Sequence, residues 1–563
     1  MKINKKIISQ ITKGLAWSSA TASLIIGVLL AATIIQTEIH GPIITDGFDN
    51  IYRQIEGRPL NQDLRDEIRA LDMLARKAYF TSLHQLRTGT ILFFIALAVL
   101  LLSWNINAAI SPPLPTRPGE KISWWKRQTQ SAKTAAITSA VVAAVLISYG
   151  IVQKYELTTM ITSRRAAILD SQQYAQWWMN FRGPGGNGVA TFSNVPIKFN
   201  GETMENIRWK IEVPLEGFNS PVVYRDKIFL TGGNKDKRQI YSFDANTGEI
   251  LWSRDVRVSG IENMTMPRVD GETGFAAPSV ATDGRNVYAI FATGELAAFT
   301  INGRPRWTKF LGIPDNHYGH ASSLITHNGL LFVQFDQHDV GRLLAINGRN
   351  GNIVWEAKRT LLSWGSPICV NTGERYELIL VDNQYVTSYD PNTGRILWRA
   401  DCLHGEVGPS AAFASGIVSV ANEYAVAAGI SVSDLSSIGD DHTIATTWER
   451  RGSLPNTASL VSIDSMTFMA SAAGVISCLD NRDGTVFWRH QLDGSFYSSP
   501  IIVGDKIFLF DRNGIMHVFA VSAEEFTPIA LSPLGEPVTT TPAILDGFMI
   551  VRGDRYLYRI EEM

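Results

Sequence analysis

Hydrophobic and polar positions divide the chain into two unlike parts. Before residue 154, apolar residues gather in three long uncharged runs, at 14–37, 88–110 and 134–153. The ~30 Å core of a bilayer needs about 20 apolar residues in a helix, so each run predicts a transmembrane helix. After residue 180, apolar residues come in short runs separated by Gly, Asn and Asp, which is typical of β-strands joined by tight turns.

The charges beside the three runs predict an orientation. Residues 1–13 carry four Lys and no acidic residue, and 111–133 carry five basic residues and one Glu. Segment 38–87 is almost neutral, with seven basic and eight acidic residues. Positive flanks stay in the cytoplasm. We therefore expect a cytoplasmic tail (1–13), a cytoplasmic loop (111–133), periplasmic segments at 38–87 and 154–180, and a bacterial inner-membrane protein whose remainder is periplasmic.

Segment 38–87 carries a helical pattern of its own. Apolar residues recur there at three and four positions, as Leu64, Ile68, Leu71, Ala75 and Ala78. This period predicts an amphipathic helix. We favour a stalk that packs on its own neighbours, and a helix that docks a partner is the alternative.

From residue 181 the pattern repeats about every 42 residues. Each repeat opens with a small residue or Pro, followed by an apolar strand, a turn and a second strand. Eight such openings occur, at Ser220, Ala277, Ala321, Ser366, Gly408, Ala458, Ser499 and Thr541. A period of this length in strand-rich units is typical of four-stranded propeller blades. The sequence predicts an all-β, eight-bladed propeller over residues 181–563.

A second element closes most repeats, as in FDANTGEILW and YDPNTGRILW. Its Asp is expected to accept hydrogen bonds from the turn and its Gly to supply a positive φ. These positions are Asp244, Asp390, Asp480, Gly248, Gly394 and Gly484. A Trp follows in the outer strand, at Trp252, Trp307, Trp355, Trp398, Trp448 and Trp488. One Trp per blade at a similar register predicts packing against the adjacent blade rather than a ligand cage.

The two ends of the repeat region are complementary. The eighth repeat stops at YLYRIEEM without a Trp strand, whereas Trp209 lies in a lone strand-like segment before the first repeat. A ring of blades leaves unpaired edges unless its ends share a blade. We therefore expect the segment around Trp209 to complete the last blade.

Charge balance and cysteine count bear on which partners and which cross-links are expected. Lys and Arg number 51 against 53 Asp and Glu, which gives no reason to expect a nucleic-acid partner. The three cysteines, Cys369, Cys402 and Cys478, are an odd number and none are adjacent, so a disulfide framework is not expected.

The blade motifs resemble those of the PQQ-like (quinoprotein alcohol dehydrogenase-like) propeller family. Its [AS]-x-D-x-x-x-G-x-x-x-W element is present at 242–252 and 388–398, and at 478–488 with Cys in place of the opening residue. The stretch WMNFRGPGGNGV at 178–189 is similar to a segment of large bacterial members. The resemblance implies the fold. It leaves function open, because the family contains quinone-dependent dehydrogenases and the lipoprotein of barrel assembly.

Two functions follow from this resemblance. We favour a non-catalytic module that binds or scaffolds envelope proteins or polymers, without a cofactor. The alternative is a membrane dehydrogenase that oxidises alcohols or sugars with PQQ and calcium. No stretch carries a recognisable quinone or calcium site; the nearest calcium pair, Asn422-Glu423, lies at the far end of a strand.

Loops before the first strand of each blade surround a propeller's axis and are the expected place for a site. The candidates there are Asn219, His320, Trp364, Glu406, Asn456, Tyr497 and Thr540. Four histidines lie close in sequence, at His317, His320, His327 and His338, and the first two form a weak candidate metal pair. We favour histidines that satisfy loop backbone instead. Insertions at 253–275 and 424–447 are the expected partner-facing loops.

Overall fold

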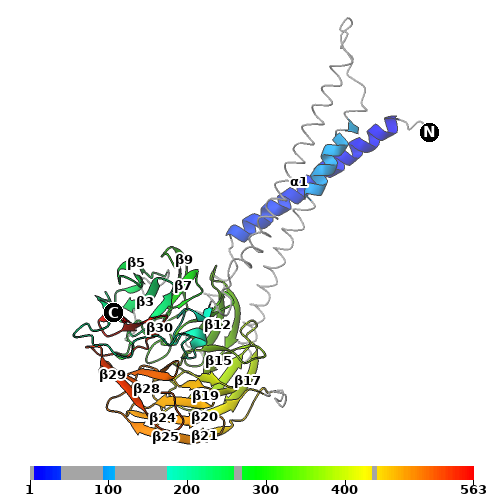
Figure 1. Cartoon of the computed structure of the whole chain (residues 1–563). Helices are drawn as coiled ribbons and strands as arrows, with labels where there is room; N and C mark the ends of the chain where they lie inside the picture. The colour runs from blue at the N-terminus through cyan, green and yellow to red at the C-terminus, as the bar shows by residue number, and fades with distance from the viewer. Residues whose placement is uncertain are drawn as a thin grey trace. The chain divides into compact units, whose positions relative to one another are not determined.

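The computed structural model describes residues 5–39, 93–104, 106–107, 174–258, 269–433 and 441–562. The chain divides into two compact units, Met1–Arg164 and Arg165–Met563. Helix α1 (Lys5–Ile39) and the helical residues 93–104 belong to the first unit, and all strands belong to the second (Figure 1).

The predicted membrane spans are not supported. Among the helices that the structure describes, none is both long and apolar enough to cross a membrane. Hydroxyl side chains interrupt the apolar run of α1, among them Ser18, Ser19, Thr21 and Ser23. Of the run 88–110, only 93–104 and 106–107 are described. The run 134–153, the loop 111–133 and the amphipathic helix around Ile68 lie outside the described residues.

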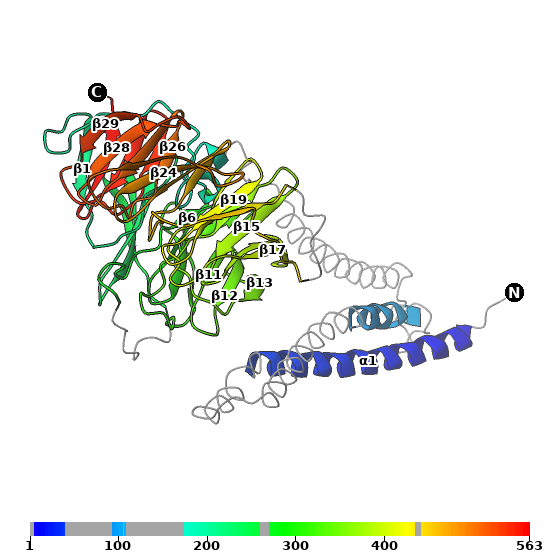
Figure 2. The same ribbon diagram turned by 90° about the horizontal axis from the view of Figure 1, so that it is seen from below.

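The second unit is a ring of eight four-stranded sheets, which confirms the predicted propeller (Figure 2). Blade 1 consists of β2 (Val222–Tyr224), β3 (Lys227–Gly233), β4 (Arg238–Asp244) and β5 (Ile250–Asp255). Blade 2 consists of β6 (Ala281–Thr282), β7 (Asn286–Ile290), β8 (Glu295–Thr300) and β9 (Pro305–Phe310). Blade 3 consists of β10 (Ile325–His327), β11 (Leu330–Phe335), β12 (Arg342–Asn347) and β13 (Ile353–Lys358). Blade 4 consists of β14 (Ile368–Asn371), β15 (Tyr376–Val381), β16 (Tyr385–Tyr389) and β17 (Ile396–Asp401).

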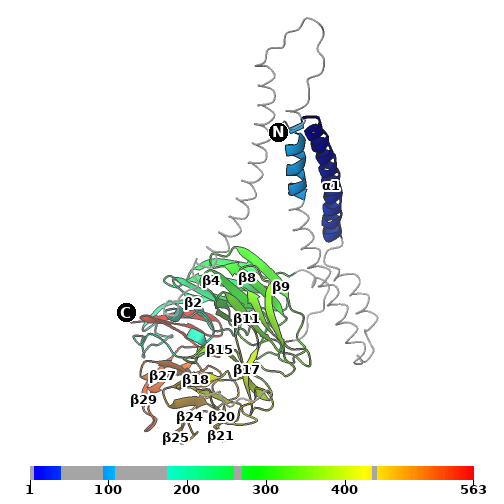
Figure 3. The same cartoon turned by 90° about the vertical axis from the view of Figure 1, so that its right-hand side faces the viewer.

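The chain continues around the ring in the same way (Figure 3). Blade 5 consists of β18 (Ala412–Ala414), β19 (Ile417–Ala421), β20 (Ala427–Ser431) and β21 (Trp448–Arg450). Blade 6 consists of β22 (Val461–Ile463), β23 (Met466–Ala470), β24 (Val475–Asp480) and β25 (Val486–Gln491). Blade 7 consists of β26 (Ile501–Val503), β27 (Lys506–Phe510), β28 (Ile515–Ala520) and β29 (Pro528–Pro533). Blade 8 consists of β30 (Ala543–Leu545), β31 (Phe548–Arg552), β32 (Tyr556–Glu561) and β1 (Ile207–Glu212).

Burial explains why the inner strands read as continuous apolar runs. Strand β7 is buried at every position, and β11 at every position but its first. Each blade packs between two neighbours, so both faces of its middle strands leave water. The outer strand β13 is instead exposed or half-buried throughout. The core therefore lies between the blades.

The N-terminal strand closes the ring, as predicted. Strand β1 pairs antiparallel with β32, with Trp209 opposite Arg559. In Figure 2, β1 lies among the red strands of the last blades. The unpaired edge of the eighth blade is thereby filled by residues more than 340 positions away, since β1 ends at 212 and β32 begins at 556.

A closed ring of hydrogen bonds joins the openings of all eight blades. In each blade a Ser or Thr backbone N–H donates to the hydroxyl oxygen of the equivalent residue in the next blade, over 2.8–3.1 Å. The members are Ser220, Ser279, Ser323, Ser366, Ser410, Ser459, Ser499 and Thr541. The last of these bonds, from Thr541 to Ser220, joins blade 8 to blade 1.

The outer-strand tryptophans join neighbouring blades. Six indole N–H groups donate to a backbone carbonyl in the turn of the next blade, those of Trp209, Trp252, Trp307, Trp355, Trp448 and Trp488. Most rings lie on that turn's glycine: a Cβ on Gly394, where φ is +72°, would stand 2.5 Å from Trp355. The motif carboxylates bond the turn, as when Asp244 accepts from the N–H of Asn246 over 2.8 Å.

Trp398 shares a core cluster with residues of blade 5, such as Val418 and Ala428, but its hydrogen bond differs from this arrangement. Its side chain is fully buried, and its indole N–H donates to Glu377 Oε2 in its own blade over 2.7 Å. The reason lies in blade 5, which has a long insertion in place of the usual turn. Residues 441–444 of that insertion instead pair along β17, where Arg399 N–H donates to His442 O and Ile444 N–H to Arg399 O.

The two predicted insertions are only partly insertions. Strand β20, Ala427–Ser431, is a regular third strand that falls inside the predicted 424–447 loop. Residues 434–440 and 259–268 lie outside the described residues. Of the first insertion, 253–258 and 269–275 are described; residues 253–255 belong to β5, and Glu272 and Thr273 contact Tyr497 and Tyr318.

Candidate functional site

The strand order fixes which loops share an end of the axis. First strands of neighbouring blades lie against one another around the axis. Because each blade is an antiparallel meander, the loop before its first strand and the loop between its second and third strands emerge at the same end. We call this end the mouth.

The opposite end is covered by the chain itself, through residues 174–194. The Val223 N–H donates to Trp178 O over 2.7 Å, the Thr282 N–H to Met179 O over 2.9 Å, and the Ala190 N–H to Ile502 O over 2.8 Å. These partners belong to blades 1, 2 and 7. Residues 174–180, at the end of the predicted periplasmic segment 154–180, thus form part of the floor of the propeller.

Arg182 ties the floor to two further blades. Its side chain is fully buried, and its guanidinium donates to the carbonyl oxygens of Ala411, at 3.2 Å, and Leu460. Burial lowers the pKa of Arg182 to about 9. At Gly183, where φ is +70°, a Cβ would stand 2.6 Å from the Trp178 ring. The FRGPGG motif is thus explained by packing of the floor.

The mouth brings together a compact group of exposed and half-buried side chains. His317 Nε2 lies 3.0 Å from Glu406 Oε1, and the Tyr318 hydroxyl donates to Glu406 Oε2 over 3.2 Å. The Trp364 ring lies 5.1 Å from the rings of both His317 and Tyr318, edge-on to each. We call these four residues the mouth cluster. They come from loops before blades 3, 4 and 5.

Backbone contacts hold the loops of the mouth cluster. The Trp364 N–H donates to Val407 O over 2.9 Å, which joins the loops of blades 4 and 5. The Trp364 indole N–H donates to Asn316 Oδ1 over 2.9 Å. The Asn422 amide donates to the carbonyl of Glu406 over 2.8 Å. The cluster therefore stands on anchored loops, while the charged ends of its side chains remain exposed to solvent.

A second contact links opposite sides of the mouth. The Tyr497 hydroxyl of blade 7 donates to Glu272 Oε2 over 2.8 Å, and Arg512 lies 4.2 Å above the Tyr497 ring. Glu272 belongs to the described part of the first insertion, in the loop before blade 2. The neighbouring Thr273 hydroxyl donates to Tyr318 O over 2.7 Å. This loop thus reaches toward both blade 7 and the mouth cluster.

Two carboxylates at the mouth, those of Glu406 and Glu272, affect the pKa values of the tyrosines beside them. Partial burial, then the charge and hydrogen bond of Glu406, raise the pKa of Tyr318. Partial burial and the hydrogen bond to Glu272 likewise raise the pKa of Tyr497. Both phenols therefore stay protonated near neutral pH and act as donors to carboxylates.

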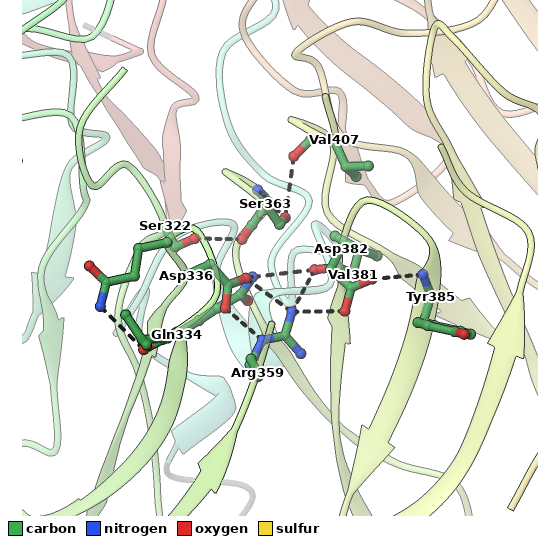
Figure 4. A network of polar contacts seen from close by, with 12 residues as sticks. Ser322, Gln334, Asp336, Arg359, Ser363, Val381, Asp382, Tyr385 and Val407 are labelled. Atoms are coloured by element: carbon green, nitrogen blue, oxygen red, sulfur yellow. Dashed lines mark hydrogen bonds and ion pairs between the residues drawn. The ribbon is translucent and has the colours of Figure 1, made fainter. Parts of the chain in front are cut away.

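A buried ion-pair network stiffens the same end between blades 3 and 4 (Figure 4). Arg359 Nε lies 2.6 Å from Asp336 Oδ1, and its Nη2 lies 3.4 Å from Asp382 Oδ2. Gln334 donates to Asp336 over 2.7 Å. Both carboxylates follow second strands and so sit at mouth-side turns. Burial raises the pKa of Asp336, against the attraction of Arg359, whose own pKa lies well above its ordinary value.

Three other predicted site residues are internal. Asn219 is fully buried and bonds to Thr231, to Ala276 O and to Arg552. Thr540 is buried and donates to Arg552 O over 2.6 Å. His320 is buried, stacks on Phe335 at 5.4 Å and has its pKa lowered to about 4 by desolvation. A position just before the first strand of a blade does not by itself tell whether a side chain is buried or exposed.

The histidines of 317–338 do not meet. His317 lies in the mouth cluster while His320 is buried against Phe335. The ring of His327 lies 4.3 Å from that of Tyr376 at an interplanar angle of 41°, and the His338 N–H donates to Asp315 O over 3.1 Å. Within the described ranges, no three His, Cys, Asp or Glu side chains group as metal ligands would.

The Asn422-Glu423 pair lies at the mouth after all, because β19 ends there. Its side chains nevertheless diverge. Asn422 donates to the carbonyls of His404 and Glu406, whereas Glu423 accepts from the side-chain amide of Asn456. A calcium ion needs several oxygens converging on one point. This pair does not supply them.

Sequence reasoning missed Asn316, Tyr318 and Arg512, and it included Glu272 and Tyr424 only as parts of the two predicted partner-facing insertions. Tyr318 was adjacent to a chosen histidine, and its aromatic character was the available signal. Arg512 and Tyr424 lie in loops between second and third strands, and the position of these loops at the mouth follows only from the strand order of each blade. Tyr424 is 62% exposed and packs beside Gly405.

Comparison with known proteins agrees with this architecture. A family model described as outer membrane protein assembly factor BamB matches residues 197–318 and 382–526. The matched segments and the ring of eight four-stranded blades together support a PQQ-like β-propeller. Three members of the mouth cluster lie within the matched segments, and Trp364 lies outside them.

Individual relatives are distant. Outer membrane protein assembly factor BamB of Shewanella oneidensis is 23% identical over 314 residues, which covers 52% of this chain and 69% of that protein. The protein of the same name from Yersinia pestis is 23% identical over 295 residues, covering 50% and 67%. The structure of a quinohemoprotein alcohol dehydrogenase from Pseudomonas putida HK5 superposes with a TM-score of 0.50 at 11% identity, covering 70% of this chain and 82% of that one. That likeness shows the fold.

Proposed function

We propose that this propeller is a non-catalytic binding module that holds an envelope protein at its mouth, in the periplasm. The observation that carries the proposal is the mouth cluster. It gathers aromatic rings and a carboxylate at one end of the axis, and the chain's own floor covers the other end. Protein interfaces favour aromatic side chains, because Trp and Tyr supply large contact areas with little loss of conformational entropy.

Two further observations support a binding role. The relatives with matching sequence are named outer membrane protein assembly factors, which makes an envelope protein the reasonable class of partner. The other polar candidates, Asn219, His320 and Thr540, are buried within the fold. The mouth cluster, by contrast, contains predicted site residues whose side chains remain accessible to a partner.

The alternative function is that of a dehydrogenase that uses PQQ and calcium. The propeller fold is compatible with this function. Such a cofactor carries three carboxylates and needs cationic partners and a converging oxygen set for calcium. Glu406, Glu423 and Glu272 are instead each paired with a different neighbour. The residues at the mouth do not fit that group, so we derive no step through it.

The test is affinity capture from detergent-solubilised envelopes with the full chain as bait. The probe variant is the double substitution Trp364→Ala and Tyr318→Ala, which removes two mouth rings. The matched control, Val354→Ala and Leu531→Ala, removes two exposed apolar side chains from outer strands, where they are 52% and 66% exposed. We expect envelope proteins on wild type and on the control, and loss of at least one of them on the probe variant.

Two results would contradict the proposal. One is capture of the same envelope proteins by all three baits, which would place the interface elsewhere. The other is dye reduction with alcohols or aldoses after reconstitution with PQQ and calcium, which would establish the dehydrogenase instead. Equal melting temperatures of the three baits serve as the folding control.

A further inference from the structure

We propose that the mouth cluster is a recognition pocket for an arginine side chain of the partner, and that His317 fills this pocket in the unbound protein. The inference rests on the proposed protein-binding function and specifies the chemistry of the contact.

The imidazole is surrounded as a bound cation would be. Its ring lies 4.2 Å from the Tyr318 ring and 5.1 Å from the Trp364 ring, at interplanar angles of 49° and 70°. Its Nε2 lies 3.0 Å from Glu406 Oε1. Two aromatic rings and one carboxylate on a flat nitrogen-bearing group are the elements of a cation–π site.

The charge of the pocket favours a cation. Within the described residues Glu406 contacts Nε2 of His317, and no Lys or Arg of those residues lies within salt-bridge distance of its carboxylate. Asp270 adds negative potential at Tyr318, where it contributes to the raised pKa of the phenol. The nearby Arg512 lies over Tyr497 and faces Glu272 instead.

Arginine suits this pocket better than lysine. A guanidinium is planar like the imidazole, stacks on aromatic rings and donates two parallel hydrogen bonds to a carboxylate. An ammonium is a strongly hydrated point charge and gives up more solvation on entry. Glu406 offers both oxygens, one now bonded to His317 and the other to the Tyr318 hydroxyl.

The pocket is accessible and its occupant is loosely held. The side chains of His317 and Glu406 are 50% and 45% exposed, and water competes with the polar contact between them, which is therefore weak. Tyr424, 62% exposed, stands on the adjacent loop and offers a further aromatic face. Rotation of one exposed side chain would free the pocket without moving the anchored loops.

The experiment uses small probes, so it does not require a known partner. N-acetyl-arginine methylamide is titrated against the full chain in detergent by saturation-transfer NMR. N-acetyl-citrulline methylamide is the neutral control of almost the same shape, and the lysine analogue is a third arm. We expect the arginine probe to bind about tenfold more tightly than citrulline and more tightly than lysine.

Two variants give effects of opposite sign. Glu406→Gln removes the carboxylate charge and should abolish the preference for arginine over citrulline. His317→Ala removes the resident side chain and should tighten arginine binding about three- to tenfold, because no group then competes for Glu406. A residue with a purely structural role would not improve binding when truncated. Trp364→Leu is a second test of the rings and should weaken the arginine probe.

The outcomes separate this inference from the proposed function. Equal binding of arginine and citrulline, or weaker arginine binding by His317→Ala, overturns the arginine pocket. Capture of envelope proteins would still stand in that case. Arginine-selective binding without any captured envelope protein overturns the proposed function and leaves the pocket's chemistry in place.

Discussion

The seam between the first and last blades should depend on Trp209. Its side chain is 9% exposed, its indole N–H donates to Ala245 O over 3.2 Å, and its ring lies on Gly248 of blade 1. Truncation of a buried Trp to Ala costs about 3–5 kcal/mol, of which the hydrogen bond is about 1 kcal/mol. Unfolding a domain of roughly 400 residues has an entropy near 0.8 kcal/mol/K, so Trp209→Ala should lower the melting temperature by about 4–6 °C.

The informative control is Trp252→Ala. Trp252 is 8% exposed and makes the same two contacts, with Ile301 O and Gly303, at a junction whose blades are joined by a continuous chain. Both variants should lose similar stability, but only Trp209→Ala should speed hydrogen exchange of the β1 and β32 amides. Calorimetry and exchange with mass spectrometry measure the two quantities. Unchanged exchange in β1, or a melting shift below about 1 °C, would refute the role of Trp209 at the seam.

Two further predictions concern acid stability and the blade turns. The pKa of His320 is lowered to about 4 by burial from an ordinary 6.5, so the unfolded chain takes up the proton first; stability is then full above pH 6.5 and falls as pH drops toward 4. Going from pH 7 to pH 5 should cost about 2 kcal/mol, and denaturant titrations of His320→Gln should lack this loss. Gly394→Ala should destabilise by about 2–4 kcal/mol, since φ is +72° and the new Cβ would stand 2.5 Å from Trp355. Gly271→Ala, with no atom within 4 Å, is its control, and equal melting of the two variants would contradict the proposed clash.

The sequence by itself determined the fold of the propeller, whereas the three transmembrane helices that it predicted are not supported. The repeat period, the Asp–Gly–Trp elements and the lone Trp209 segment predicted eight blades and their closure, because these signals are local and recur. A turn that needs a positive φ selects Gly wherever it occurs in the chain, as at Gly248 and Gly394. The sequence also placed His317, Trp364, Glu406 and Tyr497 among the loops of one end.

Tertiary structure decided which of those residues form a site. His317 and Glu406 are 89 positions apart, and Tyr497 and Glu272 are 225 apart, so their meeting depends on the curvature of the whole ring. His320 points into the fold and His317 points to solvent, and the repeat pattern of the sequence does not predict this difference. The ring of hydroxyl bonds was hidden for the same reason, since each link joins two blades and is invisible within one repeat. Local patterns specify backbone geometry, whereas contacts between blades arise only when all eight have closed.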